Sequence, residues 1–162
     1  MDEILLYGVS PMALSTFGAT MGFAAEMVGQ TKETYEDLIG KAGNSSLKDT
    51  LRELAEEEKK NYSLMEKTRR ENVTEMILEP ITGLHREDYD LDLRGLEQKD
   101  DGDLLRIVLI LEEREKKFFQ DASAKVPLPE VARIFRKISQ KKDQNVGKLQ
   151  RLGLNQTLKN VS

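Results

Sequence analysis

Apolar residues recur at spacings of three and four in four separate segments of the chain. This period places them on one face of an α-helix, so each segment predicts an amphipathic helix. No segment alternates apolar and polar residues convincingly with a period of two, and we therefore expect no strand. The four predicted stripes are Phe17, Met21, Ala24, Val28, Thr31, Tyr35, Leu38 and Ala42; Leu47, Leu51, Leu54, Glu58, Asn61 and Met65; Leu105, Val108, Glu112, Glu115, Phe119 and Ala122; and Val131, Phe135, Ile138, Lys142, Asn145, Leu149 and Leu152.

Turn-forming residues mark where these helices begin and end. Ser46, with Asp49 three residues on, is expected to cap the second helix. Aspartates within residues 100–103 place negative charge at the start of the third helix, and Pro129 suits the first position of the fourth. Residues 80–100 form the only long irregular stretch. The helix ends are expected at Gly40 and Gly43, at Pro80 and Gly83, at Val126-Pro127, and at Gly153.

The chain also repeats itself at an offset of 84 residues. One helical hairpin, over about 17–72, is therefore expected to occur again over about 103–152, with a longer link at about 73–102. We expect an all-α, antiparallel four-helix bundle that forms a single domain over residues 1–162. The corresponding pairs are Tyr35 with Phe119, Asp37 with Asp121, Lys41 with Lys125, Leu47 with Val131, Leu51 with Phe135, Arg52 with Arg136, Leu54 with Ile138, and Asn61 with Asn145.

Charged and amide residues interrupt three of the stripes midway along their helices. Residues at this height would meet in one polar layer inside the bundle. An unpaired buried charge is costly, so such a layer needs ion pairs, a metal or water. The interruptions are Glu58 and Asn61 in the second stripe, Glu112 and Glu115 in the third, and Lys142 and Asn145 in the fourth.

The composition removes several kinds of chemistry. The chain has no Cys, which excludes disulfides, thiolate metal sites, iron–sulfur clusters and cysteine nucleophiles. His85 is the only histidine, so a multi-histidine metal site is excluded as well. We expect His85 to be a solvated link residue and not a ligand. No phosphate loop, nucleophile elbow or dinucleotide fingerprint is present in the sequence.

Charge is divided unevenly along the chain. Residues 1–113 have a net charge of −12, whereas residues 114–162 have a net charge of +8. A basic last helix can bind nucleic acid, but this one lacks the aromatic residues that stack on bases. We therefore do not expect a nucleic-acid partner. The basic side chains are expected to face acidic helices of the same bundle or of a second subunit.

One uncharged segment raises the question of a membrane. Residues 4–25 carry no charge over 22 positions, and Gly18 and Gly22 have a spacing that allows close helix contact in membranes. A proline, three glycines and several hydroxyl residues dilute the apolar character of the segment. Asp2 and Glu3 precede it, whereas a signal peptide begins with basic residues. We expect a soluble, cytoplasmic protein without a membrane partner.

Three segments resemble the rubrerythrin-like branch of the ferritin-like superfamily. Leu54-Ala-Glu-Glu-Glu-Lys-Lys-Asn61 is similar to the second helix of that family, which normally reads Leu-Ala-x-Glu-Glu-x-x-His. Tyr35-Glu-Asp-Leu38, with Leu47 at its usual distance, and Leu111-Glu112-Glu-Arg-Glu-Lys-Lys-Phe118-Phe119 fit the same template. The resemblance covers most of the chain. It implies a four-helix bundle around two irons, in which each half supplies one Glu and one Glu-x-x-His pair.

Residue by residue, the resemblance implies a degenerate ligand set. Only Glu58 and Glu112 are kept, and Glu115 is the one further carboxylate that could hold iron if a metal site survives. We interpret Lys142 as a counter-charge to Glu58 and Glu112 in place of the metal, because its three donors can satisfy two carboxylates and an amide oxygen. The six ligand positions are occupied by Val28, Glu58 and Asn61 in the first half, and by Glu112, Lys142 and Asn145 in the second.

Two classes of function remain. In the class that we favour, the bundle has lost its di-iron redox site, is not an enzyme, needs no cofactor, and serves binding, assembly or regulation with a homodimer or another protein as partner. In the other class, it is a metal-binding oxidoreductase or peroxide-scavenging protein with an altered or mononuclear iron site. Lys142 and Val28 are the residues that separate the two classes. Each stands where the family has a carboxylate ligand, and Lys142 also adds a positive charge.

Overall fold

A computed structural model describes residues 13–72 and 80–161, with side chains as far as residue 155. Within this part of the chain there are four α-helices and no strand. The helix α2 packs against α3, and α4 packs against α5, so two helical hairpins form an all-α bundle as predicted. The elements are α2 (Phe17–Lys41), α3 (Ser45–Glu71), α4 (Asp101–Lys125), α5 (Pro129–Val161) and the short 3-10 helix η2 (Arg86–Asp88).

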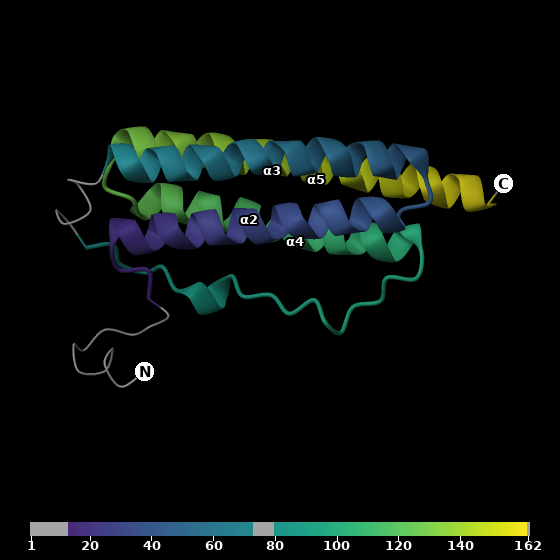
Figure 1. The fold of residues 1–162 in the computed structure, drawn as a ribbon, viewed down its shortest axis with the longest axis horizontal. Helices are drawn as coiled ribbons and strands as arrows, with labels where there is room; N and C mark the ends of the chain where they lie inside the picture. Colours follow the sequence, from purple (N-terminus) through teal and green to yellow (C-terminus); the bar gives the residue numbers. More distant parts are fainter. Residues whose placement is uncertain (1–12, 73–79, 162) are drawn as a thin grey trace.

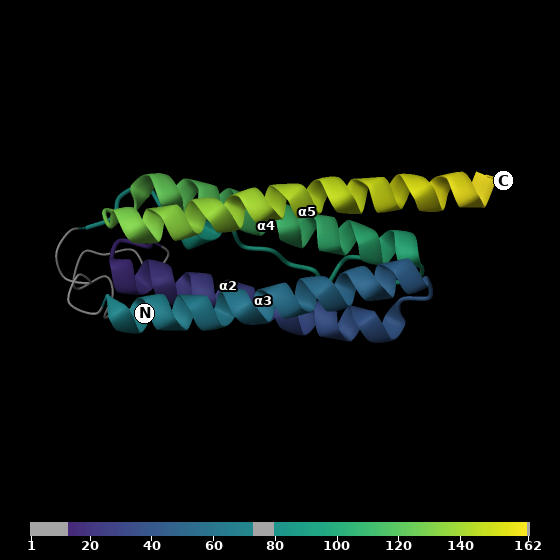
Figure 2. The same cartoon turned by 90° about the horizontal axis from the view of Figure 1, so that it is seen from above.

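The four helices lie in two layers. In Figure 1, α3 and α5 form the upper layer, and α2 and α4 lie beneath them. Figure 2, seen from above, shows the α3–α5 layer in front. The described part of the link, residues 80–100, runs along the outer side of the α2–α4 layer (Figure 1). It thus leads to the end of the bundle where α2 stops and α4 starts, and α5 projects beyond the other helices at that end (Figure 2).

The start of α3 differs from the sequence prediction. The side chain of Asn44 accepts a hydrogen bond from the backbone N–H of Leu47 at 3.0 Å. Asn44 is therefore the N-cap, and the prediction of a cap at Ser46 was wrong. An Asn oxygen one residue before the helix satisfies an N–H of the first turn that has no partner within the helix. Ser46 already lies inside the helix and is exposed.

The end of α3 also differs from the prediction. The helix ends at Glu71, well before Pro80 and Gly83. The side-chain amide of Asn72 donates to the carbonyl oxygen of Thr68 at 2.8 Å, which satisfies one of the last carbonyl groups of the helix. A polar side chain thus ends the helix before the proline is reached.

The second hairpin follows the predicted boundaries at three of its four helix ends. Asp100 is the N-cap of α4, α4 ends at Lys125, and Pro129 is the first residue of α5. The end of α5 was predicted at Gly153, but the helix continues to residue 161. Glycine at this position lets α5 approach α4, since an added Cβ would lie 2.9 Å from Cδ2 of Leu105.

The link is attached to the residues that precede α2. The backbone N–H of Leu14 donates to the carbonyl oxygen of Leu84 at 2.8 Å, and that of Ile81 donates to Ser15 at 2.9 Å. Leu14, Ile81 and Leu84 are all buried. Gly83 has a φ of 84°, a left-handed conformation that glycine adopts without strain. These contacts hold residues 81–84 of the link against the bundle.

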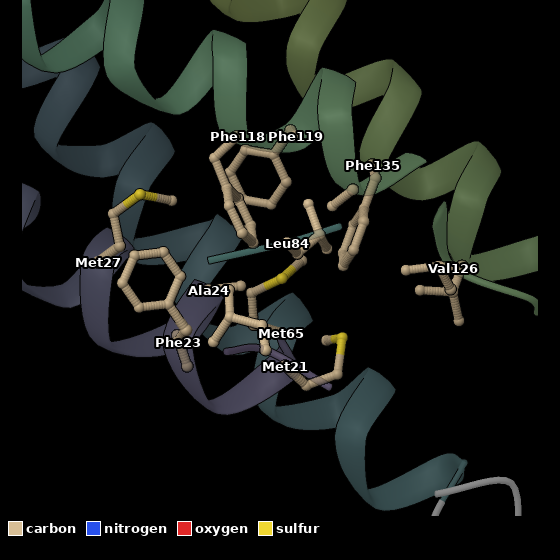
Figure 3. Packing of buried hydrophobic residues seen from close by; sticks show 14 of the residues in the cluster. Met21, Phe23, Ala24, Met27, Met65, Leu84, Phe118, Phe119, Val126 and Phe135 are labelled. Carbon is tan, nitrogen blue, oxygen red and sulfur yellow. The ribbon is translucent and has the colours of Figure 1, made fainter. Parts of the chain in front are cut away.

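An aromatic cluster fills the end of the bundle where α4 ends and α5 begins. Phe23 from α2 and Phe118 from α4 lie edge to face, with ring centroids 5.2 Å apart (Figure 3). Phe119 and Phe135 extend the cluster towards α5, with centroids 5.3 Å apart. Such tilted pairs are the favoured arrangement of aromatic rings. A second, largely aliphatic cluster fills the other half of the bundle and includes Tyr35, Leu38, Leu47, Leu51, Leu104, Leu111 and Leu149.

The four predicted stripes form the interior of the bundle. Every residue of the four stripes is buried except Asn61 and Leu152, which are half-buried. The second half of the uncharged segment 4–25 belongs to this core, and residues 4–12 lie outside the described part. No helix in residues 13–72 and 80–161 combines the length and hydropathy that crossing a bilayer requires.

The two hairpins are joined at one end by Asp101. Its carboxylate, in the first turn of α4, accepts hydrogen bonds from the backbone N–H of Gly43 at 2.9 Å and of Asn44 at 2.8 Å. We expect Asp101→Ala to lower the free energy of unfolding by about 1–2 kcal/mol, because two N–H groups lose a charged acceptor. Urea unfolding followed by circular dichroism measures this.

Asp49 provides a matched control for this prediction. Its carboxylate is exposed and pairs only with Arg52, one turn along the same helix, at 3.1 Å. Asp49→Ala should therefore change the free energy of unfolding by less than about 0.5 kcal/mol. Equal effects of the two substitutions would show that Asp101 does not stabilise the turn between α2 and α3.

Candidate functional site

A polar layer crosses the middle of the bundle between the aromatic and the aliphatic cluster. Glu58 on α3, Glu112 and Glu115 on α4, and Lys142 on α5 are each 0% exposed. Each of these residues stands at a position where the apolar stripe of its helix is interrupted. Because the stripes face the interior, side chains from three helices meet there. We call the following set the acidic layer: Tyr35, Glu57, Glu58, Glu112, Glu115, Lys142 and Asn145.

The ammonium group of Lys142 lies at the centre of the acidic layer. Its Nζ donates to Oε1 of Glu58 and to Oε2 of Glu112, the latter at 2.9 Å. Two further carboxylates are near, with Oε1 of Glu57 at 3.3 Å and Oε1 of Glu115 at 3.8 Å. One cation therefore interacts with carboxylates from both hairpins.

Glu112 is the best-satisfied carboxylate of the acidic layer. Its Oε2 accepts hydrogen bonds from Lys142 Nζ and from the hydroxyl of Tyr35, at 2.9 and 2.7 Å. Its Oε1 accepts from the side-chain amide of Asn145 at 2.8 Å. Three donors from three residues thus satisfy both oxygens of this carboxylate.

Glu58 and Glu115 are much less well satisfied. Oε2 of Glu58 and both oxygens of Glu115 have no hydrogen-bond partner in the described structure. Burial raises the pKa of Glu58 well above its usual range; the nearby Glu115 raises it further, while Lys142 opposes the rise. Burial likewise raises the pKa of Glu115, against the opposing effect of Lys142. The layer thus holds more buried carboxyl groups than its single ammonium can neutralise.

Lys142 and Tyr35 both keep their protons in this environment. Burial by itself would lower the pKa of Lys142, but Glu115, Glu58, Glu112 and Glu57 outweigh it and raise the pKa well above its usual range. Burial, and then the charge of Glu112, raises the pKa of Tyr35. Lys142 is therefore a fixed positive charge, and Tyr35 is a fixed donor.

Glu57 is the part of the acidic layer that reaches the surface. Its side chain is 19% exposed, and it accepts hydrogen bonds from Asn145 at 3.0 and 3.2 Å. It also lines an open surface groove of about 550 Å³ between α3 and α5, together with Arg52, Glu53, Glu56, Lys60 and Lys141. Glu57 therefore connects this groove to Lys142.

The structure does not bring every predicted residue into the layer. Asn61 lies a turn beyond Glu58 and is half-buried, and its side chain makes no hydrogen bond in the described structure, so its place in the layer stays a prediction. Val28 is 0% exposed and belongs to the cluster of aromatic and other apolar residues. His85 is exposed in the link, with Nδ1 4.0 Å from Glu87, as expected for a solvated residue.

The roles of three residues were not recognised from the sequence. Tyr35 was read as an apolar stripe residue, although its hydroxyl reaches Glu112. Glu57 stands in a run of three glutamates, and the helical period alone does not show that it touches Lys142. Arg114 is largely buried and donates to Thr31 at 3.3 Å, and its Nε has no hydrogen-bond partner in the described structure. Burial lowers the pKa of Arg114.

The arrangement offers one place where a metal ion could bind. Glu58, Glu112 and Glu115 each present an oxygen atom, and these atoms all lie within 4.8 Å of one another. Carboxylate oxygens suit hard divalent cations such as Mg²⁺ and Mn²⁺ and also occur in iron sites. The ammonium of Lys142 donates to two of these three carboxylates and lies 3.8 Å from the third, so a metal would have to share them or displace it.

Glu115 and Glu112 lie on the same helix, but their substitution by Gln should change the free energy of unfolding in opposite directions. Glu115→Gln removes a poorly satisfied buried carboxyl group, so it should stabilise the protein increasingly as the pH rises. The raised pKa means that the native protein holds this proton more tightly than the unfolded chain, and wild-type stability falls as the pH rises above the unfolded pKa. Between about pH 5 and pH 8, the free energy of unfolding of Glu115→Gln should rise relative to that of the wild type by at least about 1 kcal/mol, as measured by urea unfolding.

Glu112→Gln should have the opposite effect. The substitution weakens the charge-assisted bonds from Lys142 and Tyr35 and places an amide opposite the amide of Asn145. We expect a loss of about 2–4 kcal/mol near neutral pH. Similar unfolding midpoints for the Gln variants at positions 112 and 115 would contradict the assignment of Glu112 as the principal partner of Lys142.

Comparison with known proteins provides no closer guide to this site. No protein-family model matches the chain, and neither a curated protein nor a solved structure matches it significantly. The acidic layer is therefore interpreted from its own geometry, as a buried carboxylate cluster held by one lysine inside an all-α bundle.

Proposed function

We propose that this protein is a ferritin-like, rubrerythrin-type bundle in which the ammonium of Lys142 has replaced the metal centre. Its role is binding, assembly or regulation and not redox catalysis. The single observation that carries the proposal is the position of Lys142 Nζ, which donates to both Glu58 and Glu112 in a fully buried site. These are the two carboxylates that the family resemblance keeps as ligands.

The course of the chain supports the ferritin-like part of the proposal. The described part of the link between the two hairpins, residues 80–100, follows the length of the bundle (Figure 1). The polar residues of the interior lie at mid-height on α3, α4 and α5, where the resemblance places metal ligands. Val28, at a fourth position of this set, has no ligand atom and packs in the apolar core.

Electrostatics supports the loss of the di-iron site. A divalent metal about 4 Å from an ammonium would be repelled by about 8 kcal/mol at an effective dielectric constant of 20. Two irons would bring four positive charges, and only Glu58, Glu112 and Glu115 are fully buried carboxylates in the layer. A protonated Lys142 therefore favours a bundle without a metal pair.

A second candidate function rests on the unpartnered oxygens of Glu58 and Glu115. When ionised, these carboxylates and Glu112 would place more negative charge around Lys142 than its ammonium offsets, and a divalent cation would reduce this excess. Glu58, Glu112 and Glu115 would hold the ion, while Tyr35 and Asn145 would orient Glu112. Bound iron would supply the one-electron chemistry that an oxidoreductase or a peroxide-scavenging protein requires.

Metal content distinguishes the two candidates. We expect the wild-type protein, loaded anaerobically with Fe(II) and desalted, to retain less than roughly 0.1 iron per chain, because Lys142 holds the carboxylates. Lys142→Glu should retain about one iron per chain and should be less stable than the wild type without metal. Elemental analysis and urea unfolding measure these outcomes. A wild-type protein with one tightly held metal per chain would instead support the second candidate.

Lys148→Glu is the matched control for this experiment. Lys148 is also on α5, but its side chain is exposed and pairs with Glu53 at 2.7 Å on the surface. The same change of charge there should leave the metal content at the wild-type level. Equal iron in the Glu variants at positions 142 and 148 would show that the added iron binds the surface and not the acidic layer.

A further inference from the structure

The outer surfaces of the bundle carry opposite charges on opposite sides. The sequence of α5 contains eight basic and two acidic residues. Six of the basic residues are exposed, and we call them the basic stripe: Arg133, Arg136, Lys137, Lys141, Lys148 and Arg151. The described part of the link, residues 80–100, contains six acidic and three basic residues, and we call it the acidic link.

The basic stripe is nearly free of ion pairs within the molecule. In the described structure, Lys148 is the only member with a carboxylate within 4 Å, that of Glu53. Arg133 and Lys137 follow each other by one helical turn and share a face of α5. From Arg133 to Arg151 the stripe is about 27 Å long at 1.5 Å per residue. Lys141 and Lys148 thus lie near glutamates of α3, whereas Arg133, Arg136, Lys137 and Arg151 have no carboxylate partner in the described structure and retain their charge.

The acidic link cannot neutralise the basic stripe of its own molecule. Figure 1 shows the link on the outer side of the α2–α4 layer, whereas α5 belongs to the other layer. Asp88 and Asp90 lie in and just after η2, are exposed, and have no ion pair in the described residues. Asp92 and Glu97 pair only with the neighbouring Arg94 and Lys99 of the link itself. Both faces thus retain charge that a second molecule can meet.

We infer that the basic stripe of one copy docks against the acidic link of a second copy of this chain. Both features are elongated along the bundle axis, on opposite sides of the molecule (Figures 1 and 2). Two different surfaces meet in such a contact, so it is heterologous and generates rings or open stacks. Exposed ion pairs are individually weak and screened by salt, so the association is weak and depends on ionic strength. The inference gives a partner to the proposed binding role, but its test involves no metal.

Sedimentation of the full chain at low and high ionic strength tests the inference. We expect the average mass of a solution of about 200 μM protein to exceed the monomer mass of 18.4 kDa at about 20 mM salt and to return to it at about 300 mM. The double variant R133E/K137E should weaken association at low salt by at least tenfold. A mass that stays monomeric at low salt, or an association that the variant leaves intact, overturns the inference.

A charge exchange makes the test specific. The double variant D88K/D90K should also fail to associate alone, whereas an equimolar mixture of R133E/K137E and D88K/D90K should associate. In the mixture, the intact stripe of D88K/D90K meets the intact link of R133E/K137E, and the two reversed faces also carry opposite charges. K59E/K67E, an equal charge reversal on α3, should change wild-type association by less than threefold. A mixture that remains monomeric overturns the pairing of these two faces.

A nucleic acid is the alternative occupant of the basic stripe, and the same variants detect it. Fluorescence anisotropy with a labelled 20-nucleotide single strand should show at least tenfold weaker binding than self-association at the same low salt. Strong oligonucleotide binding that R133E/K137E abolishes, together with a monomeric wild-type protein, would assign the stripe to polyanions and overturn the inference.

Discussion

The interior of this bundle depends on one fully buried ammonium group. Lys142 is 0% exposed and interacts with carboxylates from α3 and α4, so that it connects the two hairpins. Removing one partner of a buried ion pair leaves an uncompensated charge, which is far more costly than the pair is favourable. The polar residues beside Lys142 help to meet this constraint. Asn145 and Tyr35 supply the donors that Lys142 does not give to Glu112.

The acidic layer is not the arrangement that would give the greatest stability. Glu58 and Glu115 are buried with oxygens that have no partner in the described structure, and well-packed apolar residues would avoid this cost. The layer does define how the hairpins fit together. Sliding one hairpin by a turn would place carboxylates against the aromatic or the aliphatic cluster. A polar layer between two apolar clusters therefore favours one register of the four helices.

The sequence was sufficient to predict the helices and the existence of a polar layer, because both follow from the period of apolar residues. Residues such as Phe17, Phe119 and Phe135 lie in the core where the stripes placed them. The helix ends were harder to predict, since Asn44 and Asn72 end their helices through single hydrogen bonds. Periodicity gives a face and a height but not a side-chain direction. For this reason the contact between Glu57 and Lys142 was not predicted.

The position of Lys142 late in the chain has a consequence for the order in which the protein is made. The α2–α3 hairpin contributes Glu57 and Glu58 to the interior but no buried cation within the described residues. When this hairpin leaves the ribosome, its cation lies 84 residues beyond Glu58 and has not yet been synthesised. The α2–α3 hairpin therefore cannot complete its core before α5 has been synthesised. Synthesis of α5 must precede commitment to the native structure.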